Sequence, residues 1–346
     1  QPQKLFEVNP EIPEILSAIV HKLMAKNAED RYQTAAGLKH DLKECLSQYA
    51  KNRKIEPFSL AAKDKNHVFR IPQKLYQREK ELLHLIQCFD QDMGGKKQLA
   101  VVSGVQGSGK SSFVLEINKP WVEKGGTFIY GKFEAYKKDE PLTGFIQAFK
   151  QWIKNVLILP QGELNFWKEK LLAALGDHGQ VLINIVPDFE IIIGPQPELP
   201  ELGPSESENR FYFTFLSLVQ AISSSPLAFV LDDLHFADSS SLRLIKLICQ
   251  NTNIDHLTLV LTHNPESGDL NEYFGELGRS VKVINLDMDL LDENHIAKLI
   301  ADALQDQSIQ VTELSKIVKS KTGGNPFFIK DFLNHLAQKK SIRFDL

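Results

Sequence analysis

Residues 104–111 read Gly104-Val105-Gln106-Gly107-Ser108-Gly109-Lys110-Ser111, which is the pattern G-x-x-x-x-G-K-[ST] of a phosphate-binding loop. The apolar run 99–102 before it is typical of a buried parallel strand, and residues 112–118 after it can form a helix. In this frame the glycines let backbone N–H groups turn toward an anion. We expect residues 104–111 and Ser112 to bind a nucleotide, with Lys110 at the β- and γ-phosphates and the Ser111 hydroxyl on Mg²⁺.

A second signature lies at Leu227-Ala228-Phe229-Val230-Leu231-Asp232-Asp233, a hydrophobic strand that ends in two acids, as in a Walker B element. We expect Asp232 to lie opposite Ser111 and to hold Mg²⁺ through water. Asp233 is then placed to orient or deprotonate the attacking water, so that Asp233 and Lys110 are the predicted catalytic residues. Because adjacent strand residues point to opposite faces, both acids can serve only at the strand end, where the chain turns.

The composition is that of a globular protein of two or three domains, with 346 residues, 42% of them hydrophobic and 24% charged. The net charge of −4 gives no overall basic character, so we expect no nucleic-acid partner. Three scattered cysteines match neither a zinc site nor a disulfide framework, which favours the reducing cytoplasm. No apolar run is long enough for a membrane span and no signal peptide is present, so we expect no membrane contact. Because residue 1 is Gln, we expect an internal fragment of a longer protein.

The N-terminal residues 1–50 carry apolar side chains at helical spacing, with Thr34 able to cap the second helix. The stretch 22–32 resembles the last helices of a protein Ser/Thr kinase domain, in which the arginine matching Arg31 is held in a buried ion pair. The Gly-rich loop, catalytic Asp loop and metal-binding Asp-Phe-Gly of kinases are missing from the sequence, so we expect no kinase activity from this chain alone. An independent helical hairpin is the alternative. Residues 51–72 are polar and basic, which predicts a linker.

Turn and capping signals predict the remaining organisation. The five prolines of residues 177–204 predict a largely irregular loop, and Ser205-x-x-Glu208 predicts a capping box for a helix over 206–223. Residues 292–340 are predicted to be helical. Within them Asn325 is a helix N-cap, Pro326 is the first helical residue, and the following Phe327 and Phe328 are expected to anchor the corner in an apolar core.

Four elements occur in one order, namely Arg78-Glu79, the loop 104–111, the acidic run 232–238 and Gly324-Asn325-Pro326. This order resembles the AAA-like ATPase module of the STAND class in large bacterial multi-domain signalling kinases. There a Ser/Thr kinase domain precedes the ATPase, and sensory domains and often a histidine kinase follow it. The resemblance implies ATP and Mg²⁺ as ligands, a P-loop NTPase α/β fold, and a parallel sheet of strand order 5-1-4-3-2 flanked by helices. It also implies a C-terminal helical lid whose Pro326 region lies over the nucleotide.

The resemblance divides the chain into four parts and names partners. Residues 1–50 would be the kinase tail, 51–72 a linker, 73–290 the P-loop ATPase core and 291–346 the helical lid. The partners would be the flanking kinase and sensor domains of the same polypeptide, with self-association left open.

Two positions depart from the pattern of the signalling ATPases. Gln77 stands where they have glycine, so Arg78 is either a nucleotide contact or a surface charge at a helix start. Thr262-His263-Asn264 stands at the end of the strand 257–262, where they carry a polar sensor residue and an arginine. Losing that arginine predicts weaker sensing of the γ-phosphate, and His263 is either its substitute or an ordinary loop residue.

The sequence therefore favours a nucleotide switch, in which ATP and Mg²⁺ bind between sheet and lid and slow hydrolysis resets the lid. A non-hydrolysing scaffold with bound nucleotide is the alternative, favoured by the missing arginine and by Asp233 in place of the usual Glu. A DNA-working ATPase is disfavoured by the negative net charge.

Overall fold

The computed structural model describes residues 3–25, 30–64, 69, 71–72, 74–91, 97–137, 140–267, 270–304 and 311–339. The chain forms two compact units. The first, here the sheet unit, is Leu75–Leu290 with Asn325–Phe327, and the second, here the helical unit, is Gln1–Lys74 with Leu291–Gly324 and Phe328–Leu346. Residues 26–29 of the kinase-like stretch and residue 340 of the predicted C-terminal helix lie outside the described residues.

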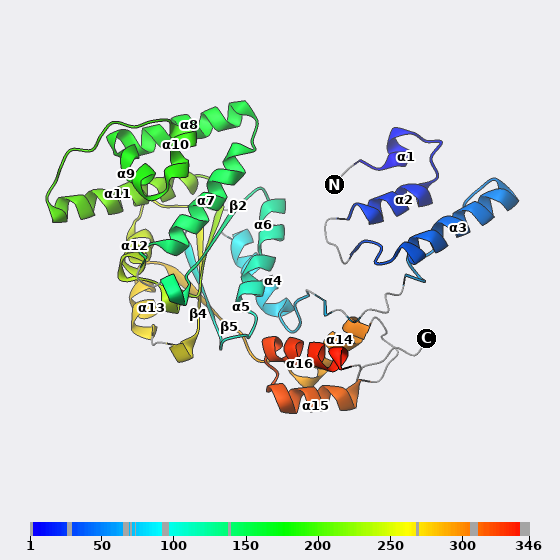
Figure 1. The fold of residues 1–346 in the computed structure, drawn as a ribbon. Coiled ribbons are helices and arrows are strands. Elements are labelled where there is room, and N and C mark those ends of the chain that lie inside the picture. The colour runs from blue at the N-terminus through cyan, green and yellow to red at the C-terminus, as the bar shows by residue number, and fades with distance from the viewer. Residues whose placement is uncertain are drawn as a thin grey trace. The chain divides into compact units, whose positions relative to one another are not determined.

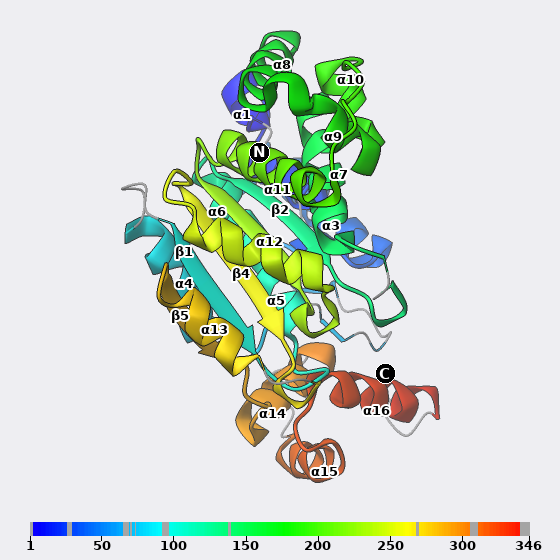
Figure 2. The same cartoon turned by 90° about the vertical axis from the view of Figure 1, so that its left-hand side faces the viewer.

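The sheet unit is built on five parallel strands, as Figures 1 and 2 show. They are β1 (Gln98–Ser103), β2 (Thr127–Lys132), β3 (Leu227–Asp232), β4 (Leu257–His263) and β5 (Lys282–Asp287). Their order across the sheet is β2-β3-β4-β1-β5, which is the predicted order 5-1-4-3-2 read from the other edge. The strands are apolar because helices cover both faces of a parallel sheet.

Successive residues of β1 point to opposite faces of the sheet, so they pack into two different layers of helices. Leu99 and Val101 join one buried cluster, and Ala100 and Val102 join another. The first layer contains α7 (Thr143–Leu157), α8 (Gln161–Leu175), α9 (Gly179–Ile185), α10 (Glu190–Ile193), α11 (Pro204–Ile222), α12 (Ser239–Gln250) and α13 (Asn271–Leu277). The second contains α4 (Glu79–Gln91), α5 (Lys110–Glu116) and α6 (Asn118–Glu123). The phosphate-binding pattern therefore lies between β1 and α5.

The edge strand β2 is held by α7. An edge strand leaves one row of backbone N–H groups unpaired by the sheet. Here Gln151 Oε1 accepts from Tyr130 N–H and Gln147 Oε1 accepts from Lys132 N–H, each at 2.8 Å. A Cβ atom on Gly131 would lie 1.8 Å from the carbonyl oxygen of Gly144 in α7, so the close approach of helix and strand requires glycine. These contacts fix the backbone at the carboxyl end of β2.

Two predictions about the connection before β3 are wrong. Residues 177–204 are not largely an irregular loop, because α9, α10 and the 3₁₀ turns Gly176–His178 and Pro187–Phe189 occupy most of 177–193 and bury Leu182 and Phe189, and the stretch without a helix is 194–203. Pro187 and Pro204 are the first residues of helical segments, a position that tolerates proline, whereas Pro195, Pro197 and Pro200 lie in the irregular part. The capping residue of α11 is also not Ser205: the helix begins at Pro204, and Glu206 Oε2 accepts the N–H of Gly203 at 3.3 Å.

The N-terminal part of the helical unit contains α1 (Leu5–Val8), α2 (Glu14–Leu23) and α3 (Ala35–Asn52). Thr34 caps α3 as predicted, since its Oγ1 accepts from Gly37 N–H at 2.9 Å. Asp64 of the predicted linker accepts hydrogen bonds from Gln33 N–H at 2.6 Å and Thr34 N–H at 2.8 Å. Apolar residues of the same segment pack on α2 and α3. The described part of residues 55–64 is therefore folded onto these helices.

The C-terminal helices are α14 (Glu293–Leu304), α15 (Thr312–Thr322) and α16 (Pro326–Gln338). Gly323 ends α15 in the left-handed conformation, and Asn325 Oδ1 accepts from Phe327 N–H at 3.0 Å, so the predicted C-cap and N-cap are both observed. The anchoring role predicted for Phe327 and Phe328 is wrong, because these side chains are 64% and 54% exposed. The apolar positions that α16 buries are Ile329 and Leu333, which share one helix face.

Candidate nucleotide-binding site

The loop between β1 and α5 has the geometry that its glycines predict. Gly107 and Gly109 adopt φ values of 81° and 98°, in the left-handed region that glycine reaches at little cost. A Cβ atom on Gly107 would lie 2.6 Å from Asn325 Oδ1. Ser108 N–H donates to the carbonyl oxygen of Val105 at 3.2 Å, which closes the turn before α5 begins at Lys110. The loop is therefore a tight backbone cradle at the carboxyl edge of the sheet.

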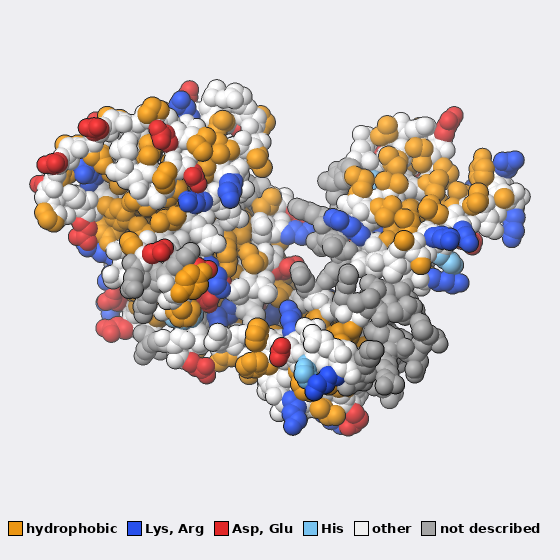
Figure 3. All heavy atoms as spheres, in the orientation of Figure 1, with side chains coloured by type: hydrophobic (Ala, Val, Ile, Leu, Met, Phe, Trp, Pro, Cys, Tyr) orange, Lys and Arg blue, Asp and Glu red, His pale blue; other side chains and the backbone are white. Residues whose placement is uncertain are grey.

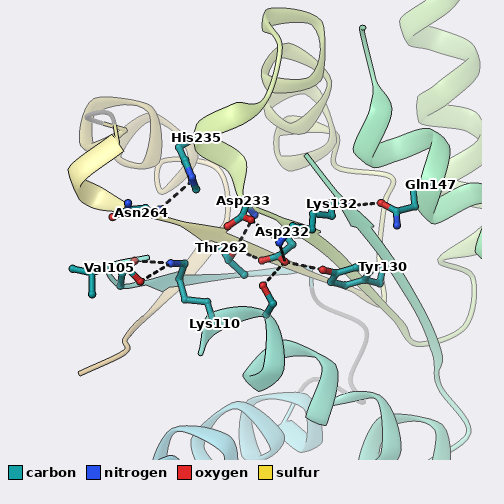
Figure 4. Close-up of polar contacts among 12 residues, drawn as sticks. Val105, Lys110, Tyr130, Lys132, Gln147, Asp232, Asp233, His235, Thr262 and Asn264 are labelled. Carbon is teal, nitrogen blue, oxygen red and sulfur yellow. Dashed lines mark hydrogen bonds and ion pairs between the residues drawn. The ribbon is translucent and has the colours of Figure 1, made fainter. Parts of the chain in front are cut away.

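Lys110 directs its ammonium group back over this loop, as Figure 4 shows. Its Nζ donates to the carbonyl oxygens of Gly104 at 2.6 Å and Val105 at 3.1 Å. Burial lowers the pKa of Lys110, and the negative charges of Asp233 and Asp232 oppose that shift. A buried cation held only by neutral carbonyls gains from a stronger anionic partner.

Asp232 lies at the end of β3, fully buried, and the structure places it against Ser111 as the sequence predicts. Ser111 Oγ donates to Asp232 Oδ2 at 2.6 Å, and Tyr130 OH donates to the same oxygen at 2.7 Å. Thr262 Oγ1 donates to Oδ1 at 2.5 Å. Burial alone would raise the pKa of Asp232, but these hydrogen bonds and the charge of Lys132 lower it. The side chain is held as a carboxylate at the carboxyl edge of the sheet.

Asp233 follows β3 with a φ of 58°, so the chain turns between the two acids, as their shared role requires. Its N–H donates to Thr262 Oγ1 at 2.8 Å. Its Oδ2 forms an ion pair with Lys132 Nζ at 2.6 Å, and the same ammonium lies 3.2 Å from Asp232 Oδ2. Both acids are thereby tied to one cation (Figure 4).

Tyr130 and Lys132 are site residues that the sequence reasoning missed, because no motif marks them. They come from β2, which pairs with β3 so that Lys132 lies opposite Asp232. Two observations together could have found them. Residues 130 and 132 share one face of their strand, and the predicted strand order places that strand next to the Walker B strand.

Residues 262–264 at the end of β4 each make different contacts. Thr262 is the residue that contacts both acids. His263 is buried, and its ring packs on Phe274 with the ring centroids 4.8 Å apart. Asn264 N–H donates to His235 Nδ1 at 3.2 Å, which leaves the His235 proton on Nε2 when the ring is neutral. Burial lowers the pKa of His235, which favours that neutral form.

Arg78 is buried, so its interpretation as a surface charge is wrong. Its guanidinium group donates to the carbonyl oxygens of Gln77, at 2.9 Å, and Asp289. Burial also lowers the pKa of Arg78. Gln77 adopts a φ of 61°, in the left-handed region that glycine reaches at little cost. Nucleotide contact by Arg78 stays a prediction.

The segment before α16 lies against the loop within the sheet unit. Asn325 Nδ2 donates to the carbonyl oxygen of Gln106 at 2.8 Å, and Phe327 N–H donates to that of Gly107 at 3.3 Å. Pro326 stands between these two contacts. Asn325 was predicted only as a helix cap, and its amide serves both the cap and the loop.

The residues present fit a nucleotide with a magnesium ion. In the described part of the chain, Ser108 Oγ is a buried hydroxyl without a hydrogen-bond partner, and it lies in the loop itself. The hard oxygens of Ser111 and Asp232 are of the type that Mg²⁺ prefers, and Mg²⁺ needs few protein ligands because it keeps several waters. Among the described residues, no group of three or more His, Cys, Asp or Glu that could hold a metal occurs.

On the face drawn in Figure 3, Lys and Arg side chains over the sheet unit lie among Asp and Glu side chains. Of the helices in the part of the chain that the structure describes, none has the length and apolar character to span a membrane.

Two solved structures are similar at low identity. The chain covers 65% of the Cdc6p protein from Pyrobaculum aerophilum, with 14% identity over 79% of this chain and a TM-score of 0.46. It covers 30% of a STAND protein with a tetratricopeptide repeat sensor from Pyrococcus horikoshii, with 13% identity over 76% of this chain and a TM-score of 0.38.

Sequence comparison gives histidine kinases and a family. The chain is 28% identical to hybrid signal transduction histidine kinase G of Dictyostelium discoideum over 99% of its own length, and 19% identical to the peroxide stress-activated histidine kinase mak3 of Schizosaccharomyces pombe over 97%. It spans only 12% and 18% of the lengths of these two relatives. The model of the AAA ATPase domain matches residues 74–261, more than half of the chain. This chain belongs to the AAA ATPase domain family.

Proposed function

We propose that the chain is the nucleotide-switch module of a multi-domain signal-transduction kinase, that it binds ATP with Mg²⁺, and that it hydrolyses ATP slowly. The observation that carries the proposal is the hydrogen bond between Ser111 of the loop and Asp232 of β3, with Lys110 and Asp233 beside them. A hydroxyl and a carboxylate meet there at the carboxyl edge of a parallel sheet, where ligands bind in open α/β folds.

Each residue has a distinct role in this proposal. The glycines and Ser108 cradle the phosphates, and Lys110 exchanges its carbonyl partners for phosphate oxygens. Ser111 and Asp232 hold the metal, which when bound supplies positive charge to the phosphates. Asp233 orients water, and Thr262 keeps the two acids in register through its hydroxyl. Arg78 and Pro326 border the nucleotide.

The surrounding polypeptide is part of the proposal. The relatives are large histidine kinases of which the chain spans a small share, so the module would pass its state to flanking kinase and sensor domains. Residues 1–50 would be the tail of a preceding Ser/Thr kinase domain. The named relatives come from an amoeba and a yeast, and the proposal does not depend on a bacterial host.

A non-hydrolysing scaffold is the second candidate, favoured by the ion pair between Lys132 and Asp233. An ammonium group that holds the carboxylate competes with an attacking water for its oxygens. The test measures ATP and ADP affinity by calorimetry beside phosphate release, with Lys110→Ala as the binding-deficient control. Turnover in the wild type that is absent from the control supports the switch, and tight binding without turnover supports the scaffold. Absence of any nucleotide affinity would reject both.

A further inference from the structure

We propose that Lys132 is the internal counter-ion of the two acids at the end of β3: its ammonium group holds Asp232 and Asp233 while the metal is absent and leaves when Mg²⁺ binds at Asp232 with the nucleotide. Lys132 is thus a positioning residue that sets how much Mg²⁺ the site requires. The inference rests on the proposed nucleotide site and goes beyond it, because no sequence motif includes this lysine.

The ammonium group of Lys132 lies between the two carboxylates. Lys132 Nζ lies 2.6 Å from Asp233 Oδ2 and 3.2 Å from Asp232 Oδ2, so it bridges the carboxylate that would hold the metal and the carboxylate that would orient water. Partial burial alone would lower the pKa of Lys132, but the hydrogen bond to Asp233 and the charge of Asp232 raise it. The group between the acids is therefore a cation.

The fold itself sets the position of Lys132. Lys132 is the last residue of β2, opposite Asp232 in the parallel register. Its N–H is held by Gln147, and the preceding Gly131 allows α7 to approach the strand. The backbone of Lys132 is fixed on two sides, while the four-carbon stem leaves the ammonium group free to swing.

The Lys132 ammonium group has a direct route into solvent. Asp232 is 0% exposed and Asp233 is 18% exposed, whereas the Lys132 side chain is 36% exposed. When a divalent cation reaches Asp232, it repels the ammonium, which can move into solvent without burying a charge. Asp232 keeps the hydrogen bonds from Ser111, Tyr130 and Thr262, so only the cation is exchanged.

The exchange has a consequence for Asp233. In the nucleotide-free arrangement its carboxylate pairs with Lys132. Displacement of the ammonium by Mg²⁺ releases that carboxylate toward the water it would orient. Lys132 thereby couples metal binding to the release of the Asp233 carboxylate toward water.

The experiment measures ADP affinity by calorimetry as a function of Mg²⁺ concentration, starting in EDTA. ADP is the probe because it needs no turnover. Lys132→Met removes the cation and keeps most of the stem, Lys132→Gln keeps a hydrogen-bond donor without charge, and Lys132→Arg keeps the charge. Lys246→Met is the matched control, since Lys246 is a half-exposed lysine in an ion pair with Glu276 on other helices.

We expect the methionine and glutamine variants to reach half-maximal affinity at a Mg²⁺ concentration lower by about fivefold or more, the scale of coupling between two bound species. The arginine variant and the Lys246 control should keep the wild-type midpoint. In EDTA without nucleotide, the Lys132→Met variant should also melt at a lower temperature than the Lys246 control, because Asp232 loses a partner while buried.

An unchanged or raised Mg²⁺ midpoint in both uncharged variants overturns the inference, and a raised one would mean that Lys132 assists the metal. Should Lys132→Met fail to fold, the glutamine and arginine pair decides the question. If the wild type binds no ADP at any Mg²⁺ concentration, the proposed function itself fails and the inference falls with it.

Discussion

Ser111 Oγ and Asp232 Oδ2 are 2.6 Å apart, although 121 residues separate them in the chain. Ser111 comes from the first turn of α5 and Asp232 from the end of β3, and the strand order places β4 between β1 and β3. The contact therefore depends on the whole sheet being assembled in register. This dependence explains why two short motifs, read separately, indicate one site.

Replacing Lys110 by alanine should abolish nucleotide binding without unfolding the chain. Its ammonium group donates to two loop carbonyls, so the unfolding free energy should fall by about 1–3 kcal/mol and the chain should stay folded. A charge-assisted hydrogen bond to phosphate is worth about 1.5–3 kcal/mol, or roughly 10- to 100-fold in affinity per contact. Calorimetry with ATP and urea denaturation measure the two effects.

The matched control is Lys97→Met. Lys97 Nζ donates to the carbonyl oxygens of Ile248 at 2.8 Å and Asn251 at 2.6 Å, at the end of α12. This variant should lose about 1–3 kcal/mol of unfolding free energy and keep its nucleotide affinity. An Lys110→Ala variant that binds ATP as the wild type does would remove the basis of the site.

The two acids should separate by role. Asp232→Asn should weaken Mg²⁺-dependent ATP affinity by about 10- to 100-fold, the usual cost of altering a metal's immediate support. Asp233→Asn should leave affinity nearly unchanged and lower turnover. Titrations with ATP in Mg²⁺ and in EDTA, beside phosphate release, measure both. Equal losses of affinity in the two variants would contradict the division.

Much of this site was predictable because its determinants are local. The loop 104–111 needs glycines at two left-handed positions, and Gly107 and Gly109 supply them. Asp232 and Asp233 stand at the end of a strand whose apolar run is visible in the sequence. The helix caps, within the site and elsewhere, are equally local: Thr34, Asp238 and Asn325 each accept a backbone N–H two or three residues further along the chain. Local chemistry can be read from local sequence.

The unpredicted part depends on partners that are distant in the chain. Lys132 meets Asp232 across 100 residues, and Gln147 meets β2 only because α7 crosses the sheet edge. The wrong helix cap at Ser205 has a local cause: Gly203 and Pro204 start α11 two residues earlier than the capping pattern suggested. Phe327 and Phe328 were assigned to a core by residue type alone, and the helix turns them outward.

Gly131→Ala should destabilise the sheet unit by about 3 kcal/mol or more, at the upper end of overpacking effects. The added Cβ would lie 1.8 Å from the Gly144 carbonyl oxygen, and both partners are backbone, so neither can rotate away. Urea denaturation measures the loss. As a control, Gly162→Ala in α8 meets no atom within 4 Å and should stabilise by up to about 1 kcal/mol. Similar stability of both variants would mean that α7 can shift away from β2.

The last prediction concerns the corner formed by Asn325 and Pro326. One side chain makes two contacts here: Asn325 Oδ1 caps α16 through Phe327 N–H, and Asn325 Nδ2 donates to Gln106 of the loop. If the loop responds to the γ-phosphate, this amide carries the response to the start of α16. A switch requires such a differential interaction between its two states.

Asn325→Asp separates the two contacts. Aspartate is a good helix cap, so the contact with Phe327 N–H is kept, but a carboxylate oxygen then faces the Gln106 carbonyl and repels it. We expect the ratio of ATP to ADP affinity to fall toward one, with little change in unfolding free energy. Asn325→Ala should lose both contacts, and its stability should fall by about 1 kcal/mol in addition.

Pro326→Gly tests the stiffness of the same corner. Proline fixes φ at the first helical position, so glycine should loosen the start of α16 and narrow the difference between ATP and ADP affinities. Stability should fall by only about 1–2 kcal/mol, the scale of helix-start and backbone-entropy effects. Calorimetric titration of both nucleotides against the wild type and the three variants measures the ratio. An unchanged ratio of ATP to ADP affinity in folded Asn325→Asp and Pro326→Gly proteins would mean that the corner is only a helix cap. The contact with Gln106 would then not couple nucleotide binding to the start of α16.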